Sequence, residues 1–197
     1  MFDIFDHNSP HYELENTGDS PRLIELGPIV VDYDLPIERM LGDNGRALFV
    51  AAMEEFLERP IRYAVDYFPN CHEGRTGKQW RYPLLFRPMP LDESWGLPHI
   101  LSAIDEAGFF PEELPSLASL GPISESIYTV FGGRVFFVGA VGPNSLMKKP
   151  SHSVRYGLQL RPNEGELNVT EYRDEDGGHS GHSGQSTWFL VRRKADD

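Results

Sequence analysis

Hydrophobic residues are densest at residues 126–141, where two runs rich in β-branched and aromatic side chains flank Gly132-Gly133. A Gly-Gly pair supplies the positive φ angles that a two-residue hairpin turn needs, and such side chains favour a pleated strand. Apolar residues occupy both odd and even positions of each run, so both faces are apolar. The pattern predicts a β-hairpin at the centre of a sheet.

Alternating apolar and polar residues predict further strands along the chain. At residues 22–33 the pattern favours two short strands, or one strand with a bulge, because Gly27-Pro28 interrupts the run. Five more strands are predicted at residues 61–68, 80–86, 153–160, 166–173 and 186–193. The pair at 153–160 and 166–173 has one polar face, which is typical of an antiparallel hairpin exposed on one side.

Two segments show the three- and four-residue spacing of amphipathic helices. Residues 45–58 carry one apolar stripe and end before Pro60, which cannot continue a helix. Residues 97–107 carry another, with Pro98 in the first turn and Gly108 directly after the last. Both helices are long enough to cover part of a sheet.

This order of elements, with a further helical turn at residues 111–120, indicates an α+β protein. We predict an antiparallel sheet of about six to eight strands with two main helices packed on one face. Residues 1–197 fit a single domain, with an irregular arm at 1–21 and a flexible loop at 174–185. The second apolar face of the central hairpin then needs cover from the chain itself, from another chain or from a ligand.

Charge and composition narrow the classes of function. The formal net charge of −12 argues against nucleic-acid binding, because phosphate contacts need Lys and Arg. No apolar run approaches the roughly 20 residues of a membrane span. The single cysteine cannot form an internal disulfide, and the acidic start of the chain lacks a signal-peptide pattern, so we expect a cytoplasmic protein. Acidity favours electrostatic attraction to basic partners, although it also serves solubility alone.

A polar loop at residues 70–81 holds the candidate catalytic pair Cys71 and His72. A thiolate nucleophile requires a nearby base or positive charge to lower its pKa. Adjacent side chains seldom point the same way, so this assignment is weak. The favoured interpretation is a cysteine that packs at the end of a strand.

The same region contains the candidate ligand-binding residues Arg75, Lys78, Trp80, Arg81 and Tyr82. Guanidinium and ammonium groups beside glycines can hold a phosphate or carboxylate, and aromatic side chains can line the site. The loop lacks the spacing of a P-loop. We favour the alternative that these bases pair with the chain's own surplus of acids.

His179 and His182 have the H-x-x-H spacing of some metal sites. A structural zinc needs two further ligands, and ordering a loop so rich in glycine and serine costs conformational entropy. The favoured interpretation is a hairpin loop with incidental histidines, and we predict no metal and no cofactor.

No G-x-S-x-G, H-E-x-x-H, G-x-G-x-x-G or C-x-x-C motif occurs. An enzyme is still compatible with the sequence, because many active sites are built from distant single residues. We predict a non-enzymatic acidic interaction protein, such as an inhibitor, an immunity-type protein or an accessory factor, that binds a protein partner or self-associates. The alternative is a small-molecule binder or enzyme whose anionic ligand is held by the basic loop at residues 70–87.

Overall fold

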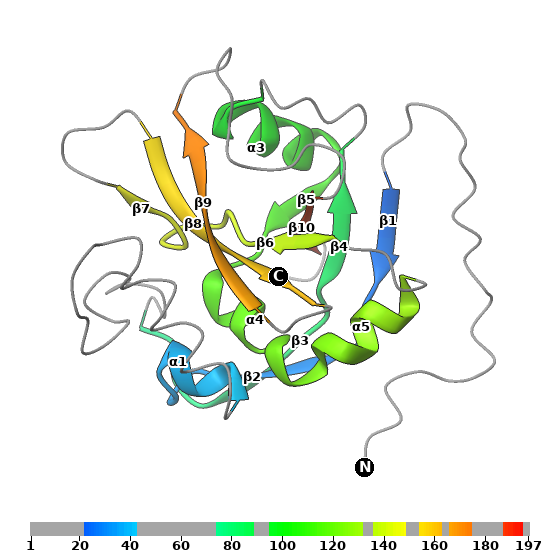
Figure 1. Cartoon of the computed structure of the whole chain (residues 1–197), viewed down its shortest axis with the longest axis vertical. Helices are drawn as coiled ribbons and strands as arrows, with labels where there is room; N and C mark the ends of the chain where they lie inside the picture. The colour runs from blue at the N-terminus through cyan, green and yellow to red at the C-terminus, as the bar shows by residue number, and fades with distance from the viewer. Residues whose placement is uncertain are drawn as a thin grey trace.

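The computed structural model describes residues 22–42, 74–88, 95–131, 136–148, 154–162, 166–174 and 187–194. Within these residues a mixed sheet has helices on both faces (Figure 1). The predicted helix at 45–58, the predicted strand at 61–68, the arm at 1–21 and most of the loop at 174–185 lie outside the described residues. The single-domain organisation therefore stays a prediction.

The described elements follow the α+β order expected from the sequence. The strands are β1 (Arg22–Glu25), β2 (Ile29–Asp32), β3 (Lys78–Arg81), β4 (Leu84–Arg87), β5 (Phe109–Pro111), β6 (Phe137–Gly139), β7 (Met147–Lys148), β8 (Val154–Arg161), β9 (Glu166–Arg173) and β10 (Thr187–Arg193). The helices are α1 (Ile37–Met40), α3 (Leu97–Glu106), α4 (Leu114–Ala118), the 3₁₀ helix η2 (Gly121–Ile123) and α5 (Ser124–Val130).

Eight strands form the main sheet in the order β1-β4-β10-β6-β8-β7, with β5 added beside β10 and β9 beside β8. The predicted antiparallel sheet is wrong in one respect, because β10 runs parallel to β6. The chain leaves β6, forms β7, β8 and β9, and returns as β10 on the other side of β6. Such a long crossover permits a parallel pair, whereas a tight hairpin does not.

Alternation along β10 divides the interior into two cores. Trp188 and Leu190 pack with α1, α4 and α5, whereas Phe189 and Val191 pack with α3. We call these the α4-side core and the α3-side core. Figure 1 shows α3 on one side of the sheet and α1, α4 and α5 on the other. The described helices therefore cover both faces, and the prediction of two helices on one face stays untested because the helix at 45–58 is not described.

The predicted hairpin at residues 126–141 is wrong in its first half, because α5 occupies residues 124–130. Ile127 and Phe131 are four residues apart, a spacing that places them on one face of a strand or of a helix. Both are buried in the α4-side core, and Phe131 stacks on Phe136 with ring centroids 3.8 Å apart. Tertiary packing thus overrides the β propensity of this segment. Its Gly132-Gly133 pair lies outside the described residues.

Several predicted elements are confirmed. The break at Gly27, with a φ angle of 74°, divides the first run into β1 and β2, which join different sheets. The helix at 97–107 is α3, and Gly108 follows it with a φ angle of 84°. The last hairpin and the final strand appear as β8, β9 and β10. The predicted strand at 80–86 is instead two strands, β3 and β4.

Tyr172 gives the α3-side core a pH dependence. Its side chain is fully buried, and its Oη accepts a hydrogen bond from Nε2 of Gln159 at 3.2 Å. Burial raises the pKa of Tyr172 well above its ordinary value, although the hydrogen bond with Gln159 acts in the opposite direction. A raised pKa means that the folded state holds this proton more tightly than the unfolded state does. The contribution of the protonated Tyr172 to the free energy of unfolding is therefore complete below about pH 10, the ordinary pKa of tyrosine. It is lost as the pH rises further.

We expect Tyr172→Phe to flatten the alkaline decline in the free energy of unfolding, because phenylalanine has no proton to lose. At neutral pH the same variant is less stable by about 1–2 kcal/mol, since the buried amide of Gln159 loses its acceptor. Urea unfolding from pH 7 to pH 11 measures both effects. Tyr82→Phe, at an exposed side chain, is the control. An alkaline decline that is equally steep in Tyr172→Phe and in the wild type contradicts this assignment.

Candidate functional site

Strands β2 and β3 form a separate two-stranded sheet, which we call the ribbon. Its register places Val30 opposite Trp80 and Asp32 opposite Lys78. Side chains alternate between the two faces of a strand. On the inner face of the ribbon, Ile29, Val31 and Tyr33 are buried in the α4-side core. The outer face exposes Val30 and Trp80 to solvent.

The ribbon separates the five predicted ligand-binding residues. Arg75 and Arg81 both reach Tyr33, which belongs to the inner face. Lys78 and Trp80 are exposed on the outer face, and Tyr82, which directly follows β3, is exposed as well. The single ligand site expected from the sequence is therefore two separate groups of side chains, one charged and one mostly aromatic.

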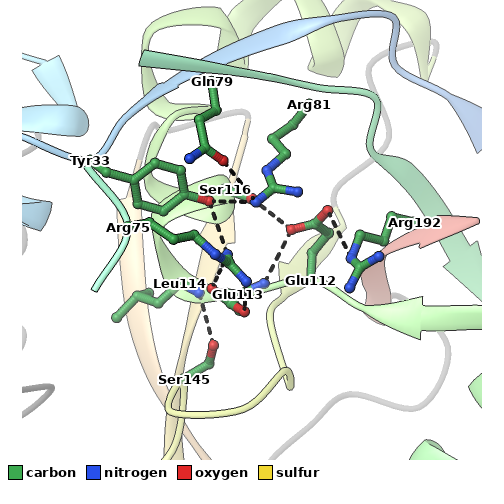
Figure 2. Close-up of polar contacts among 10 residues, drawn as sticks. All are labelled: Tyr33, Arg75, Gln79, Arg81, Glu112, Glu113, Leu114, Ser116, Ser145 and Arg192. Carbon is green, nitrogen blue, oxygen red and sulfur yellow. Dashed lines mark hydrogen bonds and ion pairs between the residues drawn. The ribbon is translucent and has the colours of Figure 1, made fainter. Parts of the chain in front are cut away.

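The hydroxyl of Tyr33 is the centre of the inner group. Its Oη accepts a hydrogen bond from Nη1 of Arg75 at 3.2 Å and another from Nη2 of Arg81 at 3.1 Å. Figure 2 shows the Tyr33 hydroxyl directed between these two arginines. Both guanidinium groups also lie near the tyrosine ring, at 5.6 and 5.9 Å from its centroid, within cation–π distance.

Arg75 forms the shortest ion pair among the described residues of the site. Its Nη1 and Nη2 donate to the two carboxylate oxygens of Glu113 at 2.7 and 3.0 Å. The Glu113 side chain is only 9% exposed, so this bidentate pair is largely shielded from water. Burial acts to lower the pKa of Arg75, but its hydrogen bond to Tyr33 and the charge of Glu113 outweigh that effect and raise it. The guanidinium is therefore charged at neutral pH.

Glu113 is held in place by the main sheet. The preceding residue, Glu112, follows β5, donates its backbone N–H to the carbonyl of Leu190 and accepts from the N–H of Gly142, both at 2.9 Å. The Leu114 N–H, at the start of α4, donates to Oγ of Ser145 at 2.8 Å. These bonds fix the short connection between β5 and α4, which carries both glutamates.

The Glu112 side chain is a second buried carboxylate. Oγ of Ser116 donates to its Oε2 at 2.7 Å, and Nε of Arg192 lies 3.9 Å from its Oε1 (Figure 2). A serine beside a carboxylate resembles a nucleophile with its base. Ser116 is fully buried, however, and Glu112 is 3% exposed, so a substrate does not reach them. The geometry supports a structural role for this pair.

On the outer face, Lys78 lies 3.7 Å from Asp32. Asp34, one of the acids that follow β2, accepts the backbone N–H of Gly77 at 2.9 Å. Two of the basic residues in this region, Arg75 and Lys78, therefore pair with acidic residues of the chain itself. The aromatic residues Trp80 and Tyr82 have the most exposed large apolar side chains of the described residues, at 59% and 62%.

Sequence reasoning missed the partners of Arg75. Glu113 is 38 residues away in the chain, and no local pattern relates the two. Glu112 and Glu113 have the sequence signature of an exposed helix start, yet both are buried. Tyr33 did carry a signal, because it continues the alternation of Ile29 and Val31.

The remaining candidates fall elsewhere. The catalytic candidates Cys71 and His72 and the metal candidates His179 and His182 lie outside the described residues. Within the described ranges, no group of three or more His, Cys, Asp or Glu side chains is arranged to hold a metal ion. None of the described helices has the length and apolar character needed to cross a membrane.

Comparisons of the chain with protein-family models, with curated proteins and with solved structures found no match.

Proposed function

We propose that this protein binds a protein partner through the outer face of the ribbon, with Trp80 and Tyr82 as the anchoring side chains. The observation that carries the proposal is their exposure, 59% and 62%, beside Val30 at 41%. Large aromatic side chains dominate the binding energy of protein interfaces and are costly to leave in water. Val30 is the cross-strand neighbour of Trp80, so the apolar surface spans both strands.

The inner face of the ribbon makes this surface rigid. Tyr33 directly follows β2, and its hydroxyl accepts hydrogen bonds from Arg75 and Arg81. Arg75 is in turn tied to Glu113 at the start of α4. A binding surface that is already ordered loses little conformational entropy when a partner docks. The charged network therefore supports binding without taking part in it.

The charge of the chain favours a basic partner. The net charge of −12 attracts positively charged proteins over distances longer than a contact. The outer face contributes little to this attraction, because Lys78 and Asp32 offset each other. We infer an inhibitor or accessory factor that is steered by its overall charge and anchored by its aromatic residues.

The double variant Trp80→Ser/Tyr82→Ser is expected to lose its partner while its thermal unfolding stays close to that of the wild type. Affinity purification from native lysate at low and high salt measures the loss. The wild type retains one specific basic protein at low salt and less of it at high salt, because salt screens the attraction. Leu23→Ser is the matched control, since Leu23 is an exposed apolar residue on the main sheet. Equal retention by the double variant and the wild type contradicts the proposal.

A further inference from the structure

Among the described residues, the inner group contains more positive than negative charge. Arg75 is balanced by Glu113, whereas the acceptors that Arg81 finds in this part of the chain are neutral: the Tyr33 hydroxyl and Oε1 of Gln79, at 3.1 and 3.2 Å. Its half-buried guanidinium forms no ion pair with any described carboxylate, and its Nε is buried with no hydrogen-bond partner in the described part of the chain. In a protein with twelve more acidic than basic residues, as its net charge of −12 shows, this arrangement is unexpected.

Two guanidinium groups that meet at one hydroxyl repel each other. Nη1 of Arg75 and Nη2 of Arg81 lie within 3.2 Å of the same oxygen atom. A cation removed from water without a counterion destabilises the folded state. Stability alone therefore does not account for Arg81, whereas an oxyanion beside it would neutralise the excess charge and accept its remaining donors.

We propose that Arg81, together with Arg75 and Tyr33, binds a small oxyanion, either a phosphate or a carboxylate. Arg75, although its charge is balanced by Glu113, places a second guanidinium beside Arg81 and is 26% exposed, so it borders solvent. Gln79 is half-buried and its amide oxygen occupies one donor of Arg81, so an arriving anion displaces a neutral group. The site lies on the inner face of the ribbon, so it is independent of the partner surface formed by Trp80 and Tyr82.

Thermal unfolding in the presence of inorganic phosphate, acetate or chloride at matched ionic strength tests the proposal, with titration calorimetry as the direct binding readout. A ligand that binds only the folded state raises the melting temperature as its concentration increases. Phosphate or acetate is expected to raise it, and a comparison of the two identifies which anion the site prefers. Chloride controls for general screening. The proposal is overturned if neither phosphate nor acetate raises the melting temperature more than chloride does and neither gives a calorimetric binding signal.

Three variants locate the site. Arg81→Gln is expected to abolish the rise and the calorimetric signal, and Arg81→Lys to weaken binding, because lysine keeps the charge but lacks the planar donor pair. Gln79→Ala is expected to tighten binding by removing the competing acceptor. Lys78→Gln, which removes a cation from the outer face of the same strand, is expected to bind as the wild type does. Equal binding by Arg81→Gln and the wild type, or equal weakening by Lys78→Gln and Arg81→Gln, contradicts the assignment.

Discussion

Replacing Arg75 with methionine is expected to lower the free energy of unfolding by about 3 kcal/mol, at the low end of the range for a broken buried ion pair. The variant keeps much of the aliphatic volume but leaves the Glu113 carboxylate buried without its bidentate partner. The value is at the low end because the Arg75 side chain is 26% exposed and water can partly replace it. Urea unfolding at neutral pH measures the loss.

Two further variants separate this effect from general damage. Arg193→Ala breaks a pair with Glu25 that is equally short, 2.6 Å, but more than half exposed on both sides, and it is expected to cost less than about 1 kcal/mol. The double variant Arg75→Met/Glu113→Leu is expected to recover most of the loss, because neither member of this pair is then left buried without its partner. If Arg75→Met and Arg193→Ala lower the free energy of unfolding by the same amount, the inner group does not stabilise the ribbon.

Gly142→Ala is expected to cost about 2–4 kcal/mol by forcing the backbone apart. A Cβ at this position would lie 2.5 Å from the carbonyl oxygen of Glu112, 2.8 Å from its carbonyl carbon and 3.0 Å from the carbonyl oxygen of Pro111. These are backbone atoms, which cannot rotate away as a flexible side chain can. The hydrogen bond from the Gly142 N–H to Glu112 is then lost or distorted.

Chemical denaturation measures this loss, with Pro143→Ala as the control at an exposed residue of the same turn. Pro143→Ala acts mainly through the unfolded chain and is expected to change stability by no more than about 1 kcal/mol. The Gly142 N–H holds the backbone of Glu112, and the next residue, Glu113, binds Arg75. Displacing Glu112 is therefore expected to weaken the contact between Glu113 and Arg75 beside the ribbon as well. A Gly142→Ala protein as stable as Pro143→Ala contradicts the close approach of Gly142 to the backbone of Glu112.

Local patterns were sufficient for the elements that one segment determines by itself. The alternation of β8 and β9 and the stripe of α3 predicted those elements correctly, as did the break at Gly27. The pattern failed at Ile127 and Phe131, where a four-residue spacing suits a strand as well as a helix. The parallel pairing of β6 with β10 joins distant segments, and no local pattern specifies it.

The candidate site shows the same limit. The sequence identified Arg75, Lys78, Trp80, Arg81 and Tyr82 as one group, because they are close in the chain. The ribbon's alternation then places Arg81 on the inner face, opposite to Lys78 and Trp80 on the outer face. The acids that hold Arg75 and Arg192 come from the connection between β5 and α4, which only the folded topology brings to them.

Photo-cross-linking from position 82 in living cells tests most directly whether the outer face of the ribbon binds a partner. A photoreactive residue in place of Tyr82 is expected to give one discrete adduct with a basic protein, and Trp80→Ser is expected to abolish it. The same photoreactive residue in place of Leu23 is expected to give no such adduct. The absence of any adduct at position 82, or identical adducts from positions 82 and 23, would contradict the account.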